Sequence, residues 1–137
     1  MSQRSGGMEN QMVGIVIVSH SQPLAESIVD YTKLMAGEAE VAAAGGLDDG
    51  GFGTSFQKIY EAIDSVYSED GVVILMDMGS AVMTTEMVLE AYGADNVEMV
   101  DCPIVEGALQ ATVNAQIGRS REEIVAELKE VATTPKF

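Results

Sequence analysis

The chain repeats one pattern: a short apolar run rich in β-branched residues, a turn of small or polar residues, and then a helical periodicity. Strands that alternate with helices form parallel sheets whose two faces are covered by helices. The pattern predicts a three-layer, doubly wound α/β domain, with helices on both faces of four parallel strands in the order 2-1-3-4. The expected strands are Gly14–Ser19, Glu40–Ala44, Gly71–Met76 and Val97–Val100.

Five helices are expected between and after these strands. The first helix should begin near Pro23 and the second near Phe56. The third should span Ala81–Tyr92 and the fourth Val105–Ile117, and the fifth should begin after Ser120. The first should pack on the sheet through an apolar stripe that includes Leu24, Ile28, Tyr31, Leu34 and Met35. The third carries Met83 and Met87, which we expect to lie in the core.

Composition excludes several classes of partner. Seven Lys and Arg against 22 Asp and Glu leave a net charge of −15, so nucleic acids and anionic membranes should repel the chain. No apolar run approaches the roughly 18–20 residues of a membrane span. The single Cys102 cannot form an internal disulfide, and one Cys with one His cannot build a Cys/His zinc site. We expect a cytoplasmic protein without metal or other cofactor.

The first 12 residues differ from the rest of the chain. They are polar, lack periodicity and carry Gly6 and Gly7 before an internal Met8. This composition is typical of a leader or tag rather than of a folded element. We expect residues 13–137 to form one domain.

His20 and Asp77 occupy matching positions, each in the turn directly after a buried strand. The strand-to-helix turns of a parallel sheet lie at its carboxyl edge, where such folds bind ligands. With the order 2-1-3-4, the first and third strands are neighbours, which would set His20 beside Asp77. A carboxylate that accepts the proton of one ring nitrogen frees the other nitrogen as a nucleophile. His20 is therefore the candidate catalytic nucleophile, oriented by Asp77.

The same edge should also bind an anion, because two helices would direct their N-termini toward His20. The candidate phosphate- or partner-binding residues around it are Ser21, Gly45, Gly46, Thr54, Ser55, Gly79 and Ser80. Simpler alternatives remain open for each group. His20 could be an ordinary turn residue, Asp77 or Ser80 could merely cap a helix, and the glycine-rich segment 45–53 could be a flexible loop.

Four motifs together resemble a known family. They are Val16–Ser21 (VIVSHS), Gly45–Ser55 (GGLDDGGFGTS), Met76–Ala81 (MDMGSA) and Pro103–Ala108 (PIVEGA). In this order they are similar to the phosphotransferase subunits of dihydroxyacetone kinases, which belong to the mannose-family IIA domains of the bacterial sugar phosphotransferase system. The likeness extends from Val13 to about Ile117.

The resemblance implies a phosphocarrier. His20 would accept a phosphoryl group from the phosphocarrier protein HPr and pass it to ADP on the nucleotide-binding kinase subunit, which then phosphorylates dihydroxyacetone. It also implies a homodimer and assigns Asp77 as the partner of His20. Some family members carry HPr-like and enzyme-I-like domains on the same chain. Because this chain has one His, we expect the single-domain form or an isolated domain.

Three alternatives share this element order. A IIA component of a mannose-type sugar transporter would also carry a His in the first turn, but the Gly45–Ser55 and Pro103–Ala108 motifs favour the dihydroxyacetone branch. A non-catalytic flavodoxin-like binding module would use a hydroxyl-rich phosphate loop and stacking aromatics, which the first turn lacks. A receiver domain needs paired acids after the first strand, where Ser19 and His20 stand instead.

Overall fold

The computed structural model describes residues 12–137. All but the last residue of the expected leader therefore lies outside the described part. The elements in chain order are β1 (Gly14–Ser19), α1 (Gln22–Thr32), β2 (Val41–Gly45), α2 (Phe56–Val66), β3 (Val72–Met76), α3 (Gly79–Tyr92), β4 (Val97–Met99), α4 (Ile104–Gln116) and α5 (Arg121–Thr133). Among these helices none is long and apolar enough to cross a bilayer.

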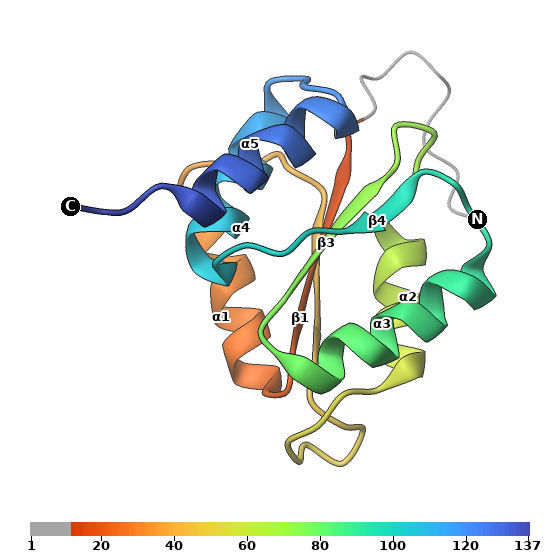
Figure 1. Cartoon of the computed structure of the whole chain (residues 1–137). Helices are drawn as coiled ribbons and strands as arrows, with labels where there is room; N and C mark the ends of the chain where they lie inside the picture. The colour runs from red at the N-terminus through yellow and green to blue at the C-terminus, as the bar shows by residue number, and fades with distance from the viewer. Residues whose placement is uncertain (1–11) are drawn as a thin grey trace.

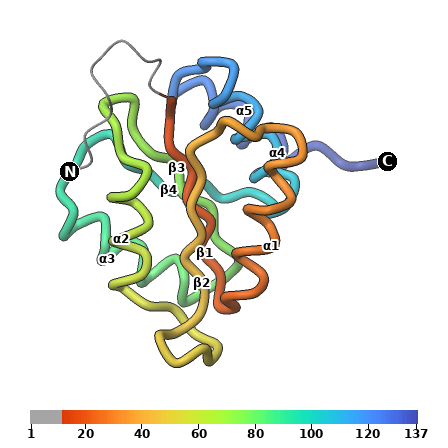
Figure 2. The backbone as a smooth tube through the Cα atoms, turned by 180° about the vertical axis from the view of Figure 1, so that it is seen from behind, coloured from red at the N-terminus to blue at the C-terminus, as the bar shows by residue number. Residues whose placement is uncertain are grey.

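The four strands form one parallel sheet in the order β2-β1-β3-β4, as the sequence predicts. Helices α2 and α3 cover one face, and α1, α4 and α5 cover the other (Figure 1). The view from behind shows β2 at one edge of the sheet, with β1 next to it (Figure 2). The three-layer, doubly wound architecture is thus confirmed.

The central strand β1 supplies both cores. All six of its residues are buried, because helices cover both faces of a parallel sheet. Successive side chains of a strand point to opposite faces, so Ile15 and Ile17 pack with α1, α4 and α5. Val16 and Val18 pack with α2 and α3. The strand that ends at Ser19 is therefore held rigidly from both sides.

Of the expected stripe of helix α1, only Ile28 packs on the sheet. It ends at Thr32, and its buried residues are Ala25, Ile28, Val29 and Thr32. Leu24, Tyr31, Leu34 and Met35 are exposed. Helix α1 approaches β2 closely at Ala25, since a side chain at Gly45 would stand 2.8 Å from the Ala25 Cβ. Leu34 and Met35 lie beyond the end of the helix.

Helix α3 also differs from expectation. It begins at Gly79, two residues before the expected start, and packs on the sheet through Ala81, Thr85 and Val88. Met83 and Met87 are exposed, which corrects the expectation that they lie in the core. Small and β-branched residues suit close packing of a helix on a sheet, and this contact turns the long methionine side chains outward.

Candidate functional site

The site forms where β1 and β3 end side by side. Their parallel register sets Val18 opposite Met76, and the N–H of Asp77 continues the pairing by donating to the carbonyl of Val18 at 3.2 Å. His20 follows β1 and Asp77 follows β3, so both lie at the carboxyl edge of the sheet. The sequence-based expectation that the strand order brings these two residues together is confirmed.

The imidazole of His20 lies between two oxygens. Its Nδ1 is 2.9 Å from Oδ1 of Asp77, and its Nε2 is 2.6 Å from Oγ of Ser80. An ionised carboxylate can only accept hydrogen bonds, so Nδ1 carries the proton and Nε2 presents its lone pair. The hydroxyl of Ser80 then donates to Nε2. The His20 side chain is 25% exposed, so a reactant can approach the ring from solvent.

Asp77 is held by hydrogen bonds on both carboxylate oxygens. Oδ1 accepts from His20 Nδ1 at 2.9 Å and from the Met78 N–H at 2.8 Å. Oδ2 accepts from the His20 N–H at 2.9 Å and from the Ser19 hydroxyl at 2.8 Å. Partial burial by itself raises the pKa of Asp77, but the hydrogen bonds from His20 and Ser19 outweigh it and hold this pKa below its ordinary value. Asp77 therefore stays ionised at neutral pH.

Helix capping does not account for Asp77 and Ser80. The N-cap of α3 is Met78, which makes no side-chain capping bond, and Ser80 lies inside the first turn of the helix. The Asp77 carboxylate accepts a hydrogen bond from the N–H of Met78, the next residue. An N-cap side chain instead accepts from the N–H of the second or third residue of the helix. Both side chains instead contact His20.

The glycine-rich segment is tied to the site by backbone hydrogen bonds. The Gly46 N–H donates to the carbonyl of Ser19 at 3.0 Å, and the Gly53 N–H donates to the carbonyl of His20 at 2.9 Å. Both glycines have positive φ, of 69° and 149°, which L side chains rarely adopt. Lys58 secures the segment by donating to the carbonyls of Gly45 at 2.9 Å and Leu47 at 3.1 Å. The segment therefore forms part of the support of His20.

The other expected phosphate- or partner-binding residues surround the site, and their side chains make no hydrogen bond to His20. Ser21 caps α1 by accepting from the Leu24 N–H at 3.3 Å, and Ser55 caps α2 by accepting from the Lys58 N–H at 3.2 Å. The Thr54 hydroxyl bonds that of Thr84 at 3.0 Å. Gly79 is the first residue of α3, and a side chain there would meet open space.

Sequence reasoning missed three contributors to the site. The Ser19 hydroxyl donates to Asp77, and the Gly53 N–H donates to the His20 carbonyl. The Lys58 ammonium holds the glycine-rich segment through the Gly45 carbonyl. One signal was present for Ser19, because a hydroxyl at the end of an otherwise apolar buried strand must find a partner. No local pattern announces the other two, which depend on contacts across the fold.

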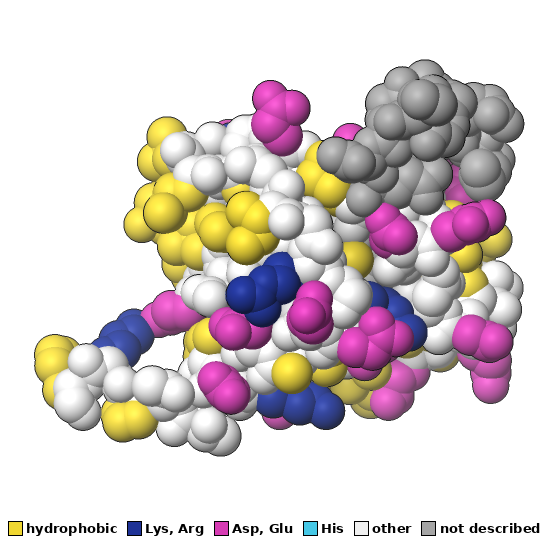
Figure 3. Space-filling model, turned by 90° about the horizontal axis from the view of Figure 1, so that it is seen from above, with side chains coloured by type: hydrophobic (Ala, Val, Ile, Leu, Met, Phe, Trp, Pro, Cys, Tyr) yellow, Lys and Arg dark blue, Asp and Glu magenta, His cyan; other side chains and the backbone are white. Residues whose placement is uncertain are grey.

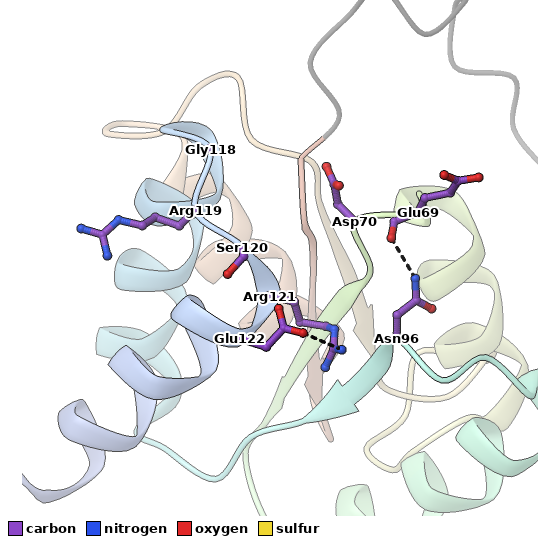
Figure 4. A pocket seen from close by; sticks show the side chains of 8 residues that line it. All are labelled: Glu69, Asp70, Asn96, Gly118, Arg119, Ser120, Arg121 and Glu122. Carbon is purple, nitrogen blue, oxygen red and sulfur yellow. Dashed lines mark hydrogen bonds and ion pairs between the residues drawn. The ribbon is translucent and has the colours of Figure 1, made fainter.

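The opposite end of the molecule carries different features. Figure 3 views that end, where acidic side chains are spread among fewer basic ones and no His is visible. A polar pocket there is lined by Glu69, Asp70, Asn96 and residues 118–122 (Figure 4). Arg121 in this pocket is paired with Glu98 and with Glu122, so its charge is not available to an anion.

Neither a metal-binding cluster nor an activated thiol lies among the described residues. Within residues 12–137, no group of three or more His, Cys, Asp or Glu side chains could hold a metal ion. Burial, followed by the charges of Asp101 and Glu106, raises the pKa of the Cys102 thiol to about 11. Cys102 is therefore a neutral thiol at physiological pH and not an activated nucleophile.

The chain matches a protein-family model and several known proteins. Residues 14–125 match the EIIA-man family model, described as the PTS system fructose IIA component. Over 121 residues the chain is 40% identical to the PEP-dependent dihydroxyacetone kinase, phosphoryl donor subunit DhaM, of Escherichia coli strain K12. That match covers 83% of this chain and 26% of the relative, so the chain spans about a quarter of that protein's length.

Shorter relatives match over nearly their whole length. The chain is 37% identical over 118 residues to the PEP-dependent dihydroxyacetone kinase 1, phosphoryl donor subunit DhaM, of Listeria innocua, covering 86% of this chain and 94% of the relative. Among solved structures, the crystal structure of the unknown function protein EF1359 has a TM-score of 0.78 and 28% identity. It covers 92% of this chain and 98% of that chain.

Proposed function

The chain belongs to the EIIA-man family, and from this membership we propose that it is a phosphocarrier that holds a phosphoryl group on Nε2 of His20. One observation carries the proposal: Asp77 holds Nδ1 of His20 while Nε2 faces Ser80 at the exposed side of the ring. An imidazole held in this tautomer presents one lone pair in one direction. We further propose that residues 13–137 act as one domain.

The proposed donor is the phosphohistidine of HPr. Nε2 of His20 attacks its phosphorus, a new P–N bond forms, the donor's P–N bond breaks, and the electron pair returns to the donor imidazole. Before this step the Ser80 hydroxyl turns its hydrogen away from Nε2 and toward an oxygen of the arriving group. Asp77 stabilises the positive charge that develops on the His20 ring.

The phosphoryl group on His20 would lie near the N-termini of α1 and α3. Helix α1 begins at Gln22 and α3 at Gly79, and N–H groups of a first helical turn favour anions. Ser80 and Gly79 belong to this anion-holding edge in the proposal. Ser21, Gly45, Gly46, Thr54 and Ser55 form the adjoining surface that partner proteins contact.

We propose ADP on the nucleotide-binding subunit of a dihydroxyacetone kinase as the acceptor. An oxygen of the β-phosphate attacks phosphorus, the P–N bond to Nε2 breaks, and ATP forms for the phosphorylation of dihydroxyacetone. The support is that the E. coli and L. innocua relatives are named phosphoryl donor subunits of this kinase. The proposal includes a homodimer as the working form.

A second candidate acceptor deserves a test because the matching family model is described as a fructose IIA component. In that case His20 would pass the phosphoryl group to the next component of a sugar transporter. The chemistry at Nε2 would be the same, and only the acceptor would differ. Adding each acceptor to phosphorylated protein therefore separates the two functions.

The deciding experiment begins with labelled phosphoenolpyruvate, enzyme I and HPr. The protein should gain one phosphoryl group that is stable in base and labile in acid, and His20→Gln should gain none. Purified phosphorylated protein is then mixed with ADP and the kinase subunits, and labelled ATP or dihydroxyacetone phosphate should form. Labelling of His20→Gln at the normal level would refute His20 as the phosphorylated residue, and no labelling of the wild-type protein would refute the phosphocarrier function. Normal labelling of His20 without transfer to ADP would refute only the acceptor.

A further inference from the structure

Ser19 is the last residue of β1 and is fully buried, at 0% exposure. Its Oγ accepts a hydrogen bond from the Ser21 N–H at 3.0 Å and lies 2.8 Å from Oδ2 of Asp77. Because a backbone N–H can only donate, the hydroxyl uses its own hydrogen for Asp77. Both capacities of this buried hydroxyl are thus satisfied, and its orientation is defined.

The bond from Ser19 acts on a torsion that is intrinsically soft. The carboxyl group of an Asp turns easily about its last bond, since that torsion has broad minima. The Met78 N–H holds Oδ1, and the His20 N–H holds Oδ2. Ser19 adds a second donor to Oδ2, from a direction set by a rigid strand. Together with the two backbone donors, it fixes the plane in which Oδ1 meets Nδ1 of His20.

We propose that Ser19 is a positioning residue for phosphoryl transfer: it locks the Asp77 carboxylate so that the His20 ring keeps its proton on Nδ1 and its lone pair on Nε2. The inference rests on the proposed phosphocarrier function. The same hydroxyl is among the groups that hold the pKa of Asp77 below its ordinary value. Ser19 also anchors the Ser21 N–H, so it connects the carboxylate to the start of α1.

Ser68 provides a matched control elsewhere in the fold. It is also buried, accepts from the N–H two residues later, that of Asp70, at 3.1 Å, and donates to the carbonyl of Met12 at 3.3 Å. It lies before β3, at the opposite edge of the sheet from His20. Ser68→Ala therefore removes the same kind of hydroxyl without touching Asp77.

The test compares Ser19→Ala, Ser19→Cys, Ser19→Thr and Ser68→Ala with the wild-type protein. Two quantities are measured: the ring ¹⁵N shifts of His20 before phosphorylation, which report its tautomer, and single-turnover transfer from phosphorylated HPr. In Ser19→Ala and in Ser19→Cys, whose thiol is a weak donor, the Nδ1–H tautomer should lose population. Transfer at saturating donor should fall about tenfold or more, as expected for losing one hydrogen bond to an ionised group.

The controls separate positioning from stability. Ser19→Thr keeps the hydroxyl and should restore the tautomer and the transfer rate, and Ser68→Ala should leave both unchanged even if its melting temperature falls. A normal tautomer and rate in either folded Ser19→Ala or Ser19→Cys would overturn the proposal. So would an equal loss of transfer in Ser68→Ala. If wild-type His20 takes no phosphoryl group, the proposed function fails, while the ¹⁵N shifts still decide whether Ser19 positions the ring.

Discussion

Nδ1 of His20 lies 2.9 Å from Oδ1 of Asp77, although 57 positions separate the two residues in the chain. The contact follows from the neighbouring parallel strands β1 and β3, whose register sets Val18 opposite Met76. Each residue stands in the turn that follows its strand. The contact between His20 and Asp77 therefore depends on β1 and β3 being neighbours in this register, and a different strand order would separate the two residues.

We predict that phosphorylation is confined to His20. After treatment with phosphoenolpyruvate, enzyme I and HPr, mass spectrometry of the intact protein should show one added phosphoryl group, which acid removes. Peptide mapping under basic conditions should assign it to His20. The neighbouring hydroxyls of Ser21 and Ser80 serve as internal controls, and phosphate on either would contradict the assignment.

Asp77→Asn should cut transfer from phosphorylated HPr by at least the ~10²-fold typical of losing positioned acid–base assistance. The amide keeps the size of the carboxyl group but loses the charge that stabilises the modified ring. Asp64→Asn is the control, because Asp64 bonds Tyr92 and does not contact His20. Single-turnover kinetics and a thermal melt are measured on both variants. Near-normal transfer by folded Asp77→Asn would show that this carboxylate is structural.

The lowered pKa of Asp77 predicts how stability depends on pH. A carboxyl whose pKa is lower in the folded state stabilises the fold above its unfolded pKa, roughly 3.9 for Asp. That contribution disappears as the pH falls through the lowered folded value. The melting temperature of the wild type should therefore exceed that of Asp77→Asn near pH 6, and the difference should shrink below about pH 4. A difference that is constant across this range would contradict the shift.

Gly45→Ala should destabilise the fold by about 1–3 kcal/mol, the usual cost of overpacking. An added Cβ would stand 2.6 Å from the carbonyl oxygen of Ser21 and 2.8 Å from the Ala25 Cβ, at the start of α1. Gly37→Ala is the matched control, since its nearest neighbour would be the Lys33 carbonyl at 3.6 Å. Chemical denaturation of both variants measures the effect. Equal midpoints for the two would argue against a tight contact at Gly45.

Association with the phosphoryl donor should depend on both charge and apolar contact. A net charge of −15 predicts slower association with a basic partner face as salt rises. Phe52, 82% exposed in the segment that supports His20, is the apolar side chain to test. Phe52→Ala should raise the KM for phosphorylated HPr and leave the saturated rate unchanged, whereas Phe137→Ala at the chain end should alter neither. An association rate that does not change with salt concentration would show that apolar contacts alone guide the encounter.

The sequence predicted the fold and the pairing of His20 with Asp77 because both follow from residue patterns that have a direct physical cause. Buried strands read as β-branched runs, right-handed crossovers limit the strand order, and turns after parallel strands share one edge. These rules placed His20 beside Asp77, and the four motifs identified the family, which the matches to relatives confirm.

Tertiary structure alone decided which atoms meet. The bond of Ser19 to Asp77, that of Ser80 to Nε2 and the hold of Gly53 on the His20 carbonyl join segments far apart in the chain. These contacts depend on side-chain rotamers and on small shifts of one element relative to another, which the periodicity of a sequence does not specify. The faces of α1 and α3 were decided in the same way. Both helices approach the sheet closely through small residues such as Ala25 and Ala81, and apolar side chains such as Leu24 and Met83 point outward although their spacing suits a core.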